Sequence, residues 1–205
     1  PGEPQNIVKK HDYYDLIKRC PTFKQIAIGV GWEQRFFEEV RIDVDLSLFM
    51  LDKTGKTRKD EDFVFYNNST AFDGSVRHGG DSRTGAGDGD DETVFIDFNG
   101  LPFDILRIMF VLSIYDQDLV GHHFGMVRDL YIRLVDREDG LEIVRFNLEE
   151  DALNGAKAMY LMCLHREGPK WFFEALGDRA QGDLANIATQ YDIIVKELQS
   201  TEKPV

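Results

Sequence analysis

The stretch that decides the fold is a nearly continuous apolar run, Ile105-Leu106-Arg107-Ile108-Met109-Phe110-Val111-Leu112-Ser113-Ile114-Tyr115. Such a run is typical of a β-strand that is covered on both of its faces. A buried helix is the competing interpretation, because a short apolar run does not by itself separate the two. The flanking Pro102 and Asp116, together with the β-branched content, favour a strand. We therefore expect a central strand in a β-sheet.

Shorter strand-like runs fill most of the remaining chain and alternate with turn signals. Residues 23–30 alternate as a strand does, with Ile26, Ile28 and Val30 on one face. The segment Asp136-Arg137-Glu138-Asp139-Gly140 separates two runs and predicts a hairpin. The other runs that we interpret as strands are residues 41–51, 62–66, 76–78, 93–98, 130–135, 141–148, 158–166 and 171–175. Together they predict an all-β protein, an antiparallel β-sandwich of two sheets.

The clearest helical pattern lies near the end of the chain. Asp183 is a suitable N-cap, and apolar residues follow it at three- and four-residue spacing as far as Ile194. A chain of 205 residues with 42% hydrophobic residues can bury a core as one domain. We expect an N-terminal extension at residues 1–22, which forms a short docking helix at most. The sandwich, with minor helical turns, would span residues 23–196, and a tail would span residues 197–205.

An acidic, glycine-rich loop lies at Gly79-Gly80-Asp81-Ser82-Arg83-Thr84-Gly85-Ala86-Gly87-Asp88-Gly89-Asp90-Asp91-Glu92. Calcium prefers six to eight oxygen ligands, and glycines let a loop turn its carbonyl groups toward an ion. The carboxylate ligands would be Asp81, Asp88, Asp90, Asp91 and Glu92. A solvated acidic loop is the alternative. Because residues 93–98 read as a strand, the acids would lie on the rim of a rigid sheet, which favours a metal site. The spacing is not that of an EF-hand.

A second acidic feature lies at the start of the predicted strand 41–51. In extended geometry Asp43, Asp45 and Ser47 point to one side, so two carboxylates could converge on one ion. A solvated face of the strand is the alternative interpretation. Asn67-Asn68 follows the next predicted strand and would offer amide oxygens or begin a turn.

The composition excludes some classes of function. A formal net charge of -13 argues against sequence-independent binding of DNA or RNA, whose affinity comes from Lys and Arg on phosphates. Bound cations suit this charge, and two Ca²⁺ ions would bring it from -13 to -9. The two cysteines, Cys20 and Cys163, lack metal-ligand spacing and read as reduced structural thiols. No apolar run is long enough to be a transmembrane segment, and no signal sequence opens the chain, so we expect a cytoplasmic protein.

These motifs, taken in order, resemble the TerD-type tellurium-resistance and stress-response family from about residue 23 to 195. The matching residues are Gly29-Val30-Gly31-Trp32, Asp43-Val44-Asp45-Leu46-Ser47, Asp62-Phe63-Val64-Phe65-Tyr66-Asn67-Asn68, Asp73-Gly74-Ser75-Val76 with His78, Gly80-Asp81, Thr84-Gly85-Ala86-Gly87-Asp88-Gly89-Asp90-Asp91-Glu92, Ile114-Tyr115-Asp116, Phe124-Gly125 and Ile132-Arg133-Leu134.

The resemblance implies a β-sandwich that binds Ca²⁺ through acidic loops and acts in bacterial resistance to tellurite and other stresses, without an established catalytic activity. It also implies other stress-response proteins as partners, with a location in the cytoplasm or at the membrane surface. Carried onto this chain, the implied calcium ligands are Asp43, Asp45, Asp81, Asp88, Asp90, Asp91, Glu92 and the carbonyl group of Gly87, with Asn67 and Asn68 as further candidates.

Four features depart from the family pattern. Glu33 stands where the family commonly has Asp, and Ser82 where it commonly has Asn. His122-His123 replaces a Gln-containing stretch, and residues 1–22 do not match the short family N-terminus. These departures leave the ion site plausible and bear mainly on any partner surface.

Two other functions remain as alternatives to a non-enzymatic calcium-binding module. The first is a metal-dependent phosphoesterase, in which an ion in the acidic loop bridges to phosphate. The second is a Ca²⁺-dependent membrane-surface binder, in which the ions bridge loop acids to anionic lipid. A transition-metal site at His122-His123 is disfavoured, because adjacent residues of an extended chain point in opposite directions.

Overall fold

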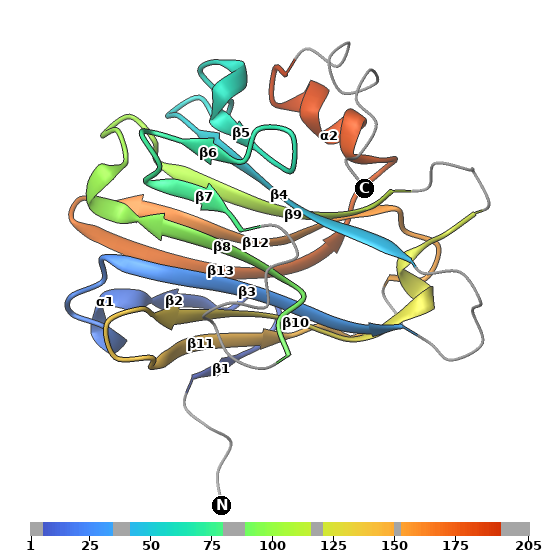
Figure 1. The fold of residues 1–205 in the computed structure, drawn as a ribbon, viewed down its shortest axis with the longest axis horizontal. Coiled ribbons are helices and arrows are strands. Elements are labelled where there is room, and N and C mark those ends of the chain that lie inside the picture. Colours follow the sequence, from blue (N-terminus) through green and yellow to red (C-terminus); the bar gives the residue numbers. More distant parts are fainter. Residues whose placement is uncertain (1–5, 35–41, 80–88, 116–120, 150–152, 194–205) are drawn as a thin grey trace, which may run out of the picture.

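The computed structural model describes residues 6–34, 42–79, 89–115, 121–149 and 153–193, and these residues form two packed β-sheets (Figure 1). In spatial order the seven-stranded sheet contains β1 (Ile7–Val8), β11 (Glu142–Asn147), β10 (Val127–Asp136), β3 (Gln25–Gln34), β8 (Glu92–Asp97), β7 (Val76–His78) and β6 (Thr70–Ala71). The six-stranded sheet contains β2 (Tyr13–Asp15), β13 (Lys170–Arg179), β12 (Ala158–Glu167), β9 (Arg107–Tyr115), β4 (Asp43–Leu51) and β5 (Phe63–Val64). The predicted two-sheet sandwich is confirmed.

The long apolar run forms the strand that the sequence predicts. It is β9, which lies between β4 and β12 and pairs with both in the antiparallel sense. Ile108, Phe110 and Leu112 pack into the core between the sheets. Val111 belongs instead to a second apolar cluster, which lies on the other face of this sheet beneath α2 (Leu184–Gln190). The run is apolar on both faces because one face meets the other sheet and the other face meets a helix.

The helix that covers this face begins as the sequence predicts. Asp183 caps α2, since its carboxylate accepts the N–H of Asn186 while the Asn186 side chain accepts the N–H of Asp183. Ile187 and Tyr191 pack against Phe49 and Val111 of the six-stranded sheet. Fully burying an apolar side chain of this size stabilises the fold by roughly 1.5–3 kcal/mol, so these contacts hold the helix in place.

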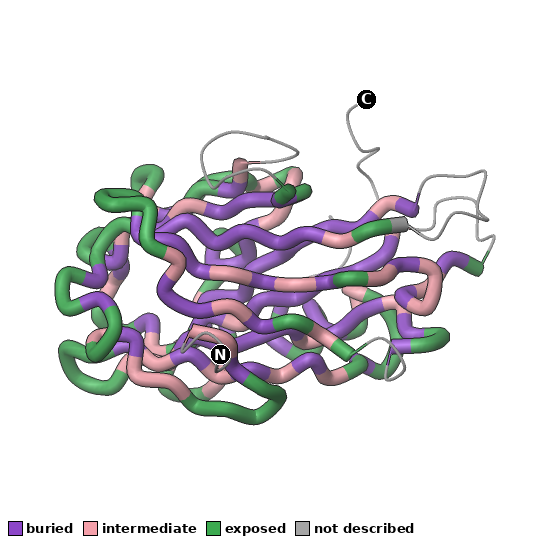
Figure 2. Tube along the Cα trace, turned by 90° about the horizontal axis from the view of Figure 1, so that it is seen from below, coloured by how far each residue is buried: buried purple, intermediate pink, exposed green. Residues whose placement is uncertain are grey.

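The core follows the middle of the strands. In Figure 2 the strands are mostly buried along their length, whereas the turns at their ends are exposed. The short 3₁₀ turns η1 (Asp60–Asp62), η2 (Phe98–Gly100) and η3 (Phe124–Met126) lie at such ends. The hairpin at residues 136–140 is present and joins β10 to β11. The cysteines Cys20 and Cys163 are both free and buried.

The N-terminal segment, which the sequence suggests is an extension, contributes to both sheets in its described part. β1 pairs in parallel with β11, and β2 pairs with β13. Between β2 and β3 lies α1 (Leu16–Arg19), in which Leu16 is completely buried. β1 and β2 are too short to show a periodic pattern, so the sequence-based prediction misses them, whereas the equally short β7 follows the turn residues Asp73-Gly74-Ser75 and is predicted.

Other boundaries differ from the sequence-based prediction by a few residues. The strand predicted at 62–66 is only Phe63–Val64, because Phe65 pairs back to Asn68 in an isolated bridge. β6 has no counterpart among the predicted strands, and β3 continues to Gln34. None of the helices in the described residues is both long enough and apolar enough to cross a membrane.

Candidate functional site

Neighbouring strands hold both ends of the acidic loop. β7 leads into it and β8 leads out, and the two strands are paired, with the N–H of Gly79 donating to the carbonyl of Thr93 at 2.8 Å. At the other end, the Asp91 carboxylate accepts the N–H of Trp32 at 2.8 Å, and the Asp91 N–H donates to the carbonyl of Val30. Three predicted ligands, Asp81, Gly87 and Asp88, lie outside the described residues.

Asp90 is a buried carboxylate on the outer face of the seven-stranded sheet. Its side chain is 3% exposed and forms an ion pair with Arg133, whose Nη2 lies 2.9 Å from Oδ2. The Nε of Arg133 and the hydroxyl of Tyr131 also donate to Asp90, the hydroxyl at 2.6 Å. Burial and this hydrogen bond raise the pKa of Tyr131. A carboxylate has about four lone-pair sites, so these donors satisfy most of its hydrogen-bonding capacity.

Two glycines of β3 make room for this arrangement. Ile28 and Val30 point into the core, so Gly29 and Gly31 face outward. A Cβ atom added at Gly29 would collide with the Asp90 carboxylate, and one added at Gly31 would collide with the Tyr131 ring. Of the residues that make this site, only Asp90 is a candidate ligand from the sequence. Gly29, Gly31 and Arg133 occur in the family motifs without an assigned role, and the sequence gives no signal for Tyr131.

Substituting Gly29 therefore tests the geometry around Asp90. The Gly29→Ala variant is expected to lose about 1–3 kcal/mol of unfolding free energy, because the methyl group displaces the carboxylate from Arg133. Urea denaturation measures this loss. In an Asp90→Ala background the collision is absent, so adding Gly29→Ala should cost much less. Equal costs in the two backgrounds would show that the methyl group acts elsewhere.

Glu92 reaches from one sheet to the other. It belongs to β8, yet its Oε2 accepts the N–H of Leu46 on β4 at 2.8 Å. His78 of β7 contacts the same residue. Its Nε2 lies 2.9 Å from the Leu46 carbonyl oxygen and 3.3 Å from Glu92 Oε2. Burial lowers the pKa of His78, but the hydrogen bond and charge of Glu92, together with the Leu46 carbonyl and the charge of Asp45, raise the pKa overall. Side chains of one sheet thus satisfy both backbone groups of one residue in the other.

The acids of β4 lie next to this contact. Asp45 precedes Leu46 directly and is 6% exposed, and its charge contributes to the raised pKa of His78. The solvated-face interpretation therefore does not describe Asp45, whereas Asp43 at the start of the strand is half-buried. The hydroxyl of Ser47, two residues further along, is buried and has no hydrogen-bond partner among the described residues.

The remaining predicted ligands are Asn67 and Asn68. Asn68 closes a turn, with its amide nitrogen donating to the carbonyl of Phe63 at 2.7 Å, while Asn67 is exposed. The ring of His123 accepts the N–H groups of Gly125 and Gly155 through Nδ1 at 3.1 and 3.0 Å, which caps η3. In the described parts of the chain, no group of three or more His, Cys, Asp or Glu side chains is arranged to hold a metal ion.

A family model described as the TerD domain matches residues 6–191. The chain belongs to the TerD family. The match begins before β1, so β1, β2 and α1 lie within the TerD domain. The resemblance suggested by the acidic motifs is thereby confirmed.

Curated TerD-family relatives cover most of the chain. It is 42% identical over 178 residues to "Tellurium resistance protein TerD" of Serratia marcescens. The aligned segment covers 87% of this chain and 92% of that protein. It is also 38% identical over 182 residues to "General stress protein 16U" of Bacillus subtilis. This aligned segment covers 88% of this chain and 94% of that protein. These relatives are named for resistance and stress response rather than for a reaction.

Solved structures show the same fold. A homologue of telluride resistance protein (TerD) from Streptomyces coelicolor A3(2) superposes with a TM-score of 0.61 at 19% identity, covering 80% of this chain and 95% of that one. A second solved protein, described as of unknown function, gives a TM-score of 0.62 at 20% identity, covering 80% and 94%. At these identities the similarity supports the fold alone.

Proposed function

We propose that this TerD-family chain is a non-enzymatic, calcium-binding module of the stress response, of the kind named for tellurite resistance. The curated relatives support the biological setting, since they are called tellurium resistance and stress proteins. The chemistry of the candidate residues supports the ion. The candidate donors are carboxylate, amide and backbone carbonyl oxygens, which suit a hard cation such as Ca²⁺ better than a transition metal.

The observation that carries the proposal is the contact between Glu92 and Leu46. Glu92 and Leu46 are 46 residues apart in sequence and belong to strands of different sheets, so their contact does not arise from chain proximity. Glu92 ends the loop, and its carboxylate binds the backbone of the residue that follows Asp45. Glu92, where the loop joins β8, therefore lies close to Asp45, which supports a composite site of loop and β4 acids.

The contacts suggest a division of roles among the acids. Asp90 is held by Arg133 and Tyr131, and a cation placed beside Arg133 would be repelled by the guanidinium. We assign Asp90 to anchoring the loop, and Asp91 and Glu92 to fixing its return into β8. The ligands would then be Asp43 and Asp45 with the loop residues Asp81, Asp88 and the carbonyl of Gly87. An ion there would neutralise acids that otherwise repel one another.

Calcium should raise the thermal stability of the chain. An ion that binds only the folded state at a hundred times its Kd adds about 2.7 kcal/mol. For a chain of this length, that free energy corresponds to roughly 5–10 °C between melts in EGTA and in saturating Ca²⁺. In the Asp45→Asn variant the difference between the two melts should largely disappear. Calorimetric titration of the same variant should show weakened calcium binding.

Two other variants separate ligands from anchors. Asp90→Asn should lower the melting temperature in both buffers yet keep the calcium-dependent increase, because its partner is Arg133. Asp178→Asn, which removes only an exposed carboxylate paired with Lys10, should match the unmodified chain in both buffers. Identical melts of the unmodified chain in EGTA and in Ca²⁺ would contradict calcium binding. A full calcium effect in Asp45→Asn would contradict the assignment of Asp45.

A further inference from the structure

Phe95 lies at the centre of a small arginine cluster on the outer face of the seven-stranded sheet. It is half-buried against Ala27 and Val135, its neighbours on β3 and β10. The guanidinium carbon of Arg77 lies 5.0 Å from the centre of its ring, and that of Arg137 lies 4.5 Å away. Arg77 reaches the ring from β7, and Arg137 from the turn after β10. Two guanidinium groups thus share one aromatic ring.

These two arginines differ from others on the same face. Arg133 pairs with Asp90, and Arg145 pairs with Glu142 at 3.0 Å. Arg77 and Arg137 are both exposed, and within the described residues neither has a carboxylate within ion-pair distance. In a chain with a net charge of -13, two adjacent arginines without a described carboxylate at ion-pair distance are unexpected. Because both side chains are exposed, their guanidinium groups can contact a ligand from solution.

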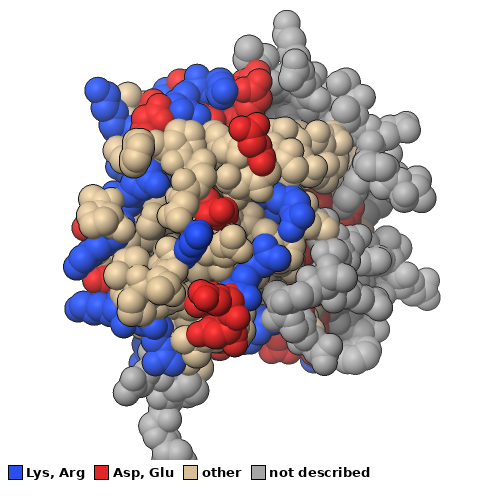
Figure 3. Space-filling view, turned by 60° about the vertical axis from the view of Figure 1, so that its left-hand side comes forward, with Lys and Arg blue, Asp and Glu red and all other residues tan. Residues whose placement is uncertain are grey.

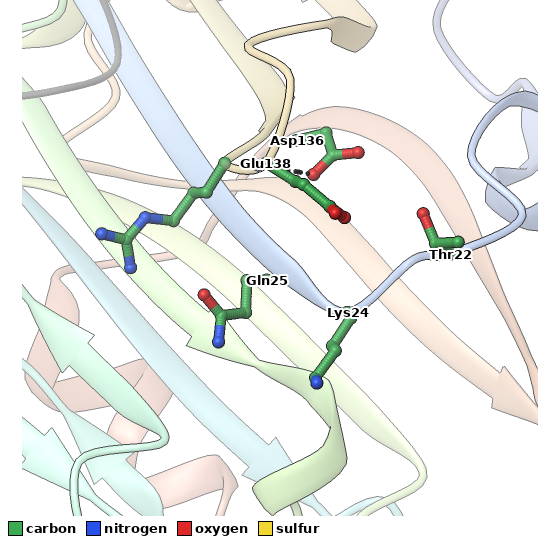
Figure 4. A pocket seen from close by; sticks show the side chains of 6 residues that line it. Thr22, Lys24, Gln25, Asp136 and Glu138 are labelled. Atoms are coloured by element: carbon green, nitrogen blue, oxygen red, sulfur yellow. Dashed lines mark hydrogen bonds between the residues drawn. The ribbon is translucent and has the colours of Figure 1, made fainter.

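A pocket adjoins this cluster and adds a third cation. It has a volume of about 280 Å³ and is lined by Thr22, Lys24, Gln25, Asp136, Arg137 and Glu138. Figure 4 shows Lys24 and Gln25 extending to one side, whereas the carboxylate of Glu138 points toward Thr22. Asp136 accepts the N–H of Glu138 at 3.0 Å and the thiol of Cys20 at 3.4 Å. Its carboxylate is therefore already used within the protein.

We propose that this surface, defined by Arg77, Phe95, Arg137 and Lys24 and called here the arginine face, binds an acidic peptide segment of a partner protein. Carboxylates accept paired hydrogen bonds from guanidinium groups, and stacking on an aromatic ring fixes the orientation of each guanidinium before binding. The pre-ordered side chains lose less conformational entropy on binding than free arginines would.

A short acidic segment suits this surface better than a long polyanion. In the view of Figure 3 uncharged residues cover most of the described surface, and basic side chains lie scattered over it among separate groups of acidic ones. A nucleic acid or an anionic membrane would extend beyond the basic residues and meet the field of a chain with charge -13. A peptide of a few residues would contact the arginine face alone.

The arginine face is independent of the proposed calcium site. None of its four residues is a candidate ligand, and the face is built from β7, β8 and the ends of β3 and β10. Binding of an acidic peptide should therefore be the same in EGTA and in Ca²⁺. Failure of the peptide-binding proposal would leave the calcium proposal unaffected, and failure of the calcium proposal would leave the peptide-binding proposal unaffected.

The test is fluorescence anisotropy with a fluorescein-labelled hexaglutamate peptide and the full chain at low salt. The variant Arg77→Gln/Arg137→Gln should bind the peptide at least tenfold more weakly, and each single variant several-fold more weakly. Replacing both arginines by lysine should give an intermediate loss, because charge is kept and planar stacking is lost. Hexaglutamine should not bind.

The matched control removes a charge from the other sheet. Arg179 is exposed at the end of β13, and Arg179→Gln should bind hexaglutamate as the unmodified chain does. Equal weakening by Arg179→Gln would reveal a general charge effect and overturn the proposal. Unchanged binding of hexaglutamate by Arg77→Gln/Arg137→Gln would also overturn the proposal. A double variant that loses binding to phosphatidylserine vesicles but keeps binding to hexaglutamate would assign the face to a membrane instead. Matching circular dichroism melts of all variants exclude misfolding as the cause.

Discussion

Replacing Arg133 with methionine is expected to lower the free energy of unfolding by about 3–5 kcal/mol, because the substitution leaves the buried charge of Asp90 without its cation. Arg133 is itself only 14% exposed and provides most of the hydrogen bonds that Asp90 accepts. Tyr131 remains as a donor in the variant, but a neutral hydroxyl does not balance a buried charge. Urea denaturation measures the loss.

Two comparisons give this prediction its specificity. Lys10→Met removes a salt bridge to Asp178 in which both side chains are 43% exposed, and it should cost less than about 1 kcal/mol. Adding Asp90→Leu to Arg133→Met removes the stranded charge, so the double variant should be more stable than Arg133→Met alone. If Arg133→Met costs no more than Lys10→Met, the buried pair does not stabilise the fold as the contacts imply.

Replacing Glu92 with glutamine should reverse the way in which stability depends on pH. In the unmodified chain the pKa of His78 is raised, so its contribution to stability is full below the ordinary pKa of about 6.5 and is lost as the pH rises through the folded value. Burial is the largest single influence on this pKa, so without the charge of Glu92 we expect the pKa of His78 to fall below its ordinary value. The stability of Glu92→Gln should therefore increase as the pH rises toward 6.5.

The expected loss in Glu92→Gln is about 3–5 kcal/mol near pH 5.5, where a buried imidazolium loses its partner, and it should shrink above pH 7. Urea denaturation midpoints from pH 5.5 to 8.5, measured in EGTA, test both the size of the stability loss and the sign of its dependence on pH.

A matched control is Glu174→Gln. It breaks a second His–Glu pair, with His165 at 3.2 Å, whose side chains are 21% and 35% exposed. This control should cost about 1 kcal/mol or less. Parallel pH profiles for the unmodified chain and Glu92→Gln would contradict the prediction.

The sequence predicts the long strands well because their apolar patterns extend over many residues. Residues 105–115 could be assigned from their composition, and the hairpin at 136–140 from its turn residues. The short strands β1, β2 and β6 could not be assigned, since two or three residues carry no period, and β7 was assigned only because the turn residues Asp73-Gly74-Ser75 precede it. Their conformation depends on pairing with strands that are distant in sequence.

The acidic site could be predicted only in part, for a related physical reason. Clustering in the sequence identifies Asp90 and Glu92, but their partners lie about 14–46 residues away and come from other strands. Gly29 and Gly31 were visible as glycines in a strand, and such glycines often mark the close approach of another group. Which groups approach them, Asp90 and Tyr131, depends on the register of β3 with its neighbours.

The contacts at Leu46 also affect how readily this protein can aggregate through an exposed strand edge. β5 pairs with β4 only at Leu48 and Phe49. At Leu46, therefore, β5 no longer lies beside β4 to pair with its backbone. A strand edge with unused backbone groups is a template for pairing with another chain, and such pairing begins aggregates. Glu92 and His78 occupy the N–H and the carbonyl of Leu46 from the opposite sheet. The same two side chains that join the sheets therefore cover this edge at Leu46, where its backbone groups would otherwise be open to a neighbouring molecule.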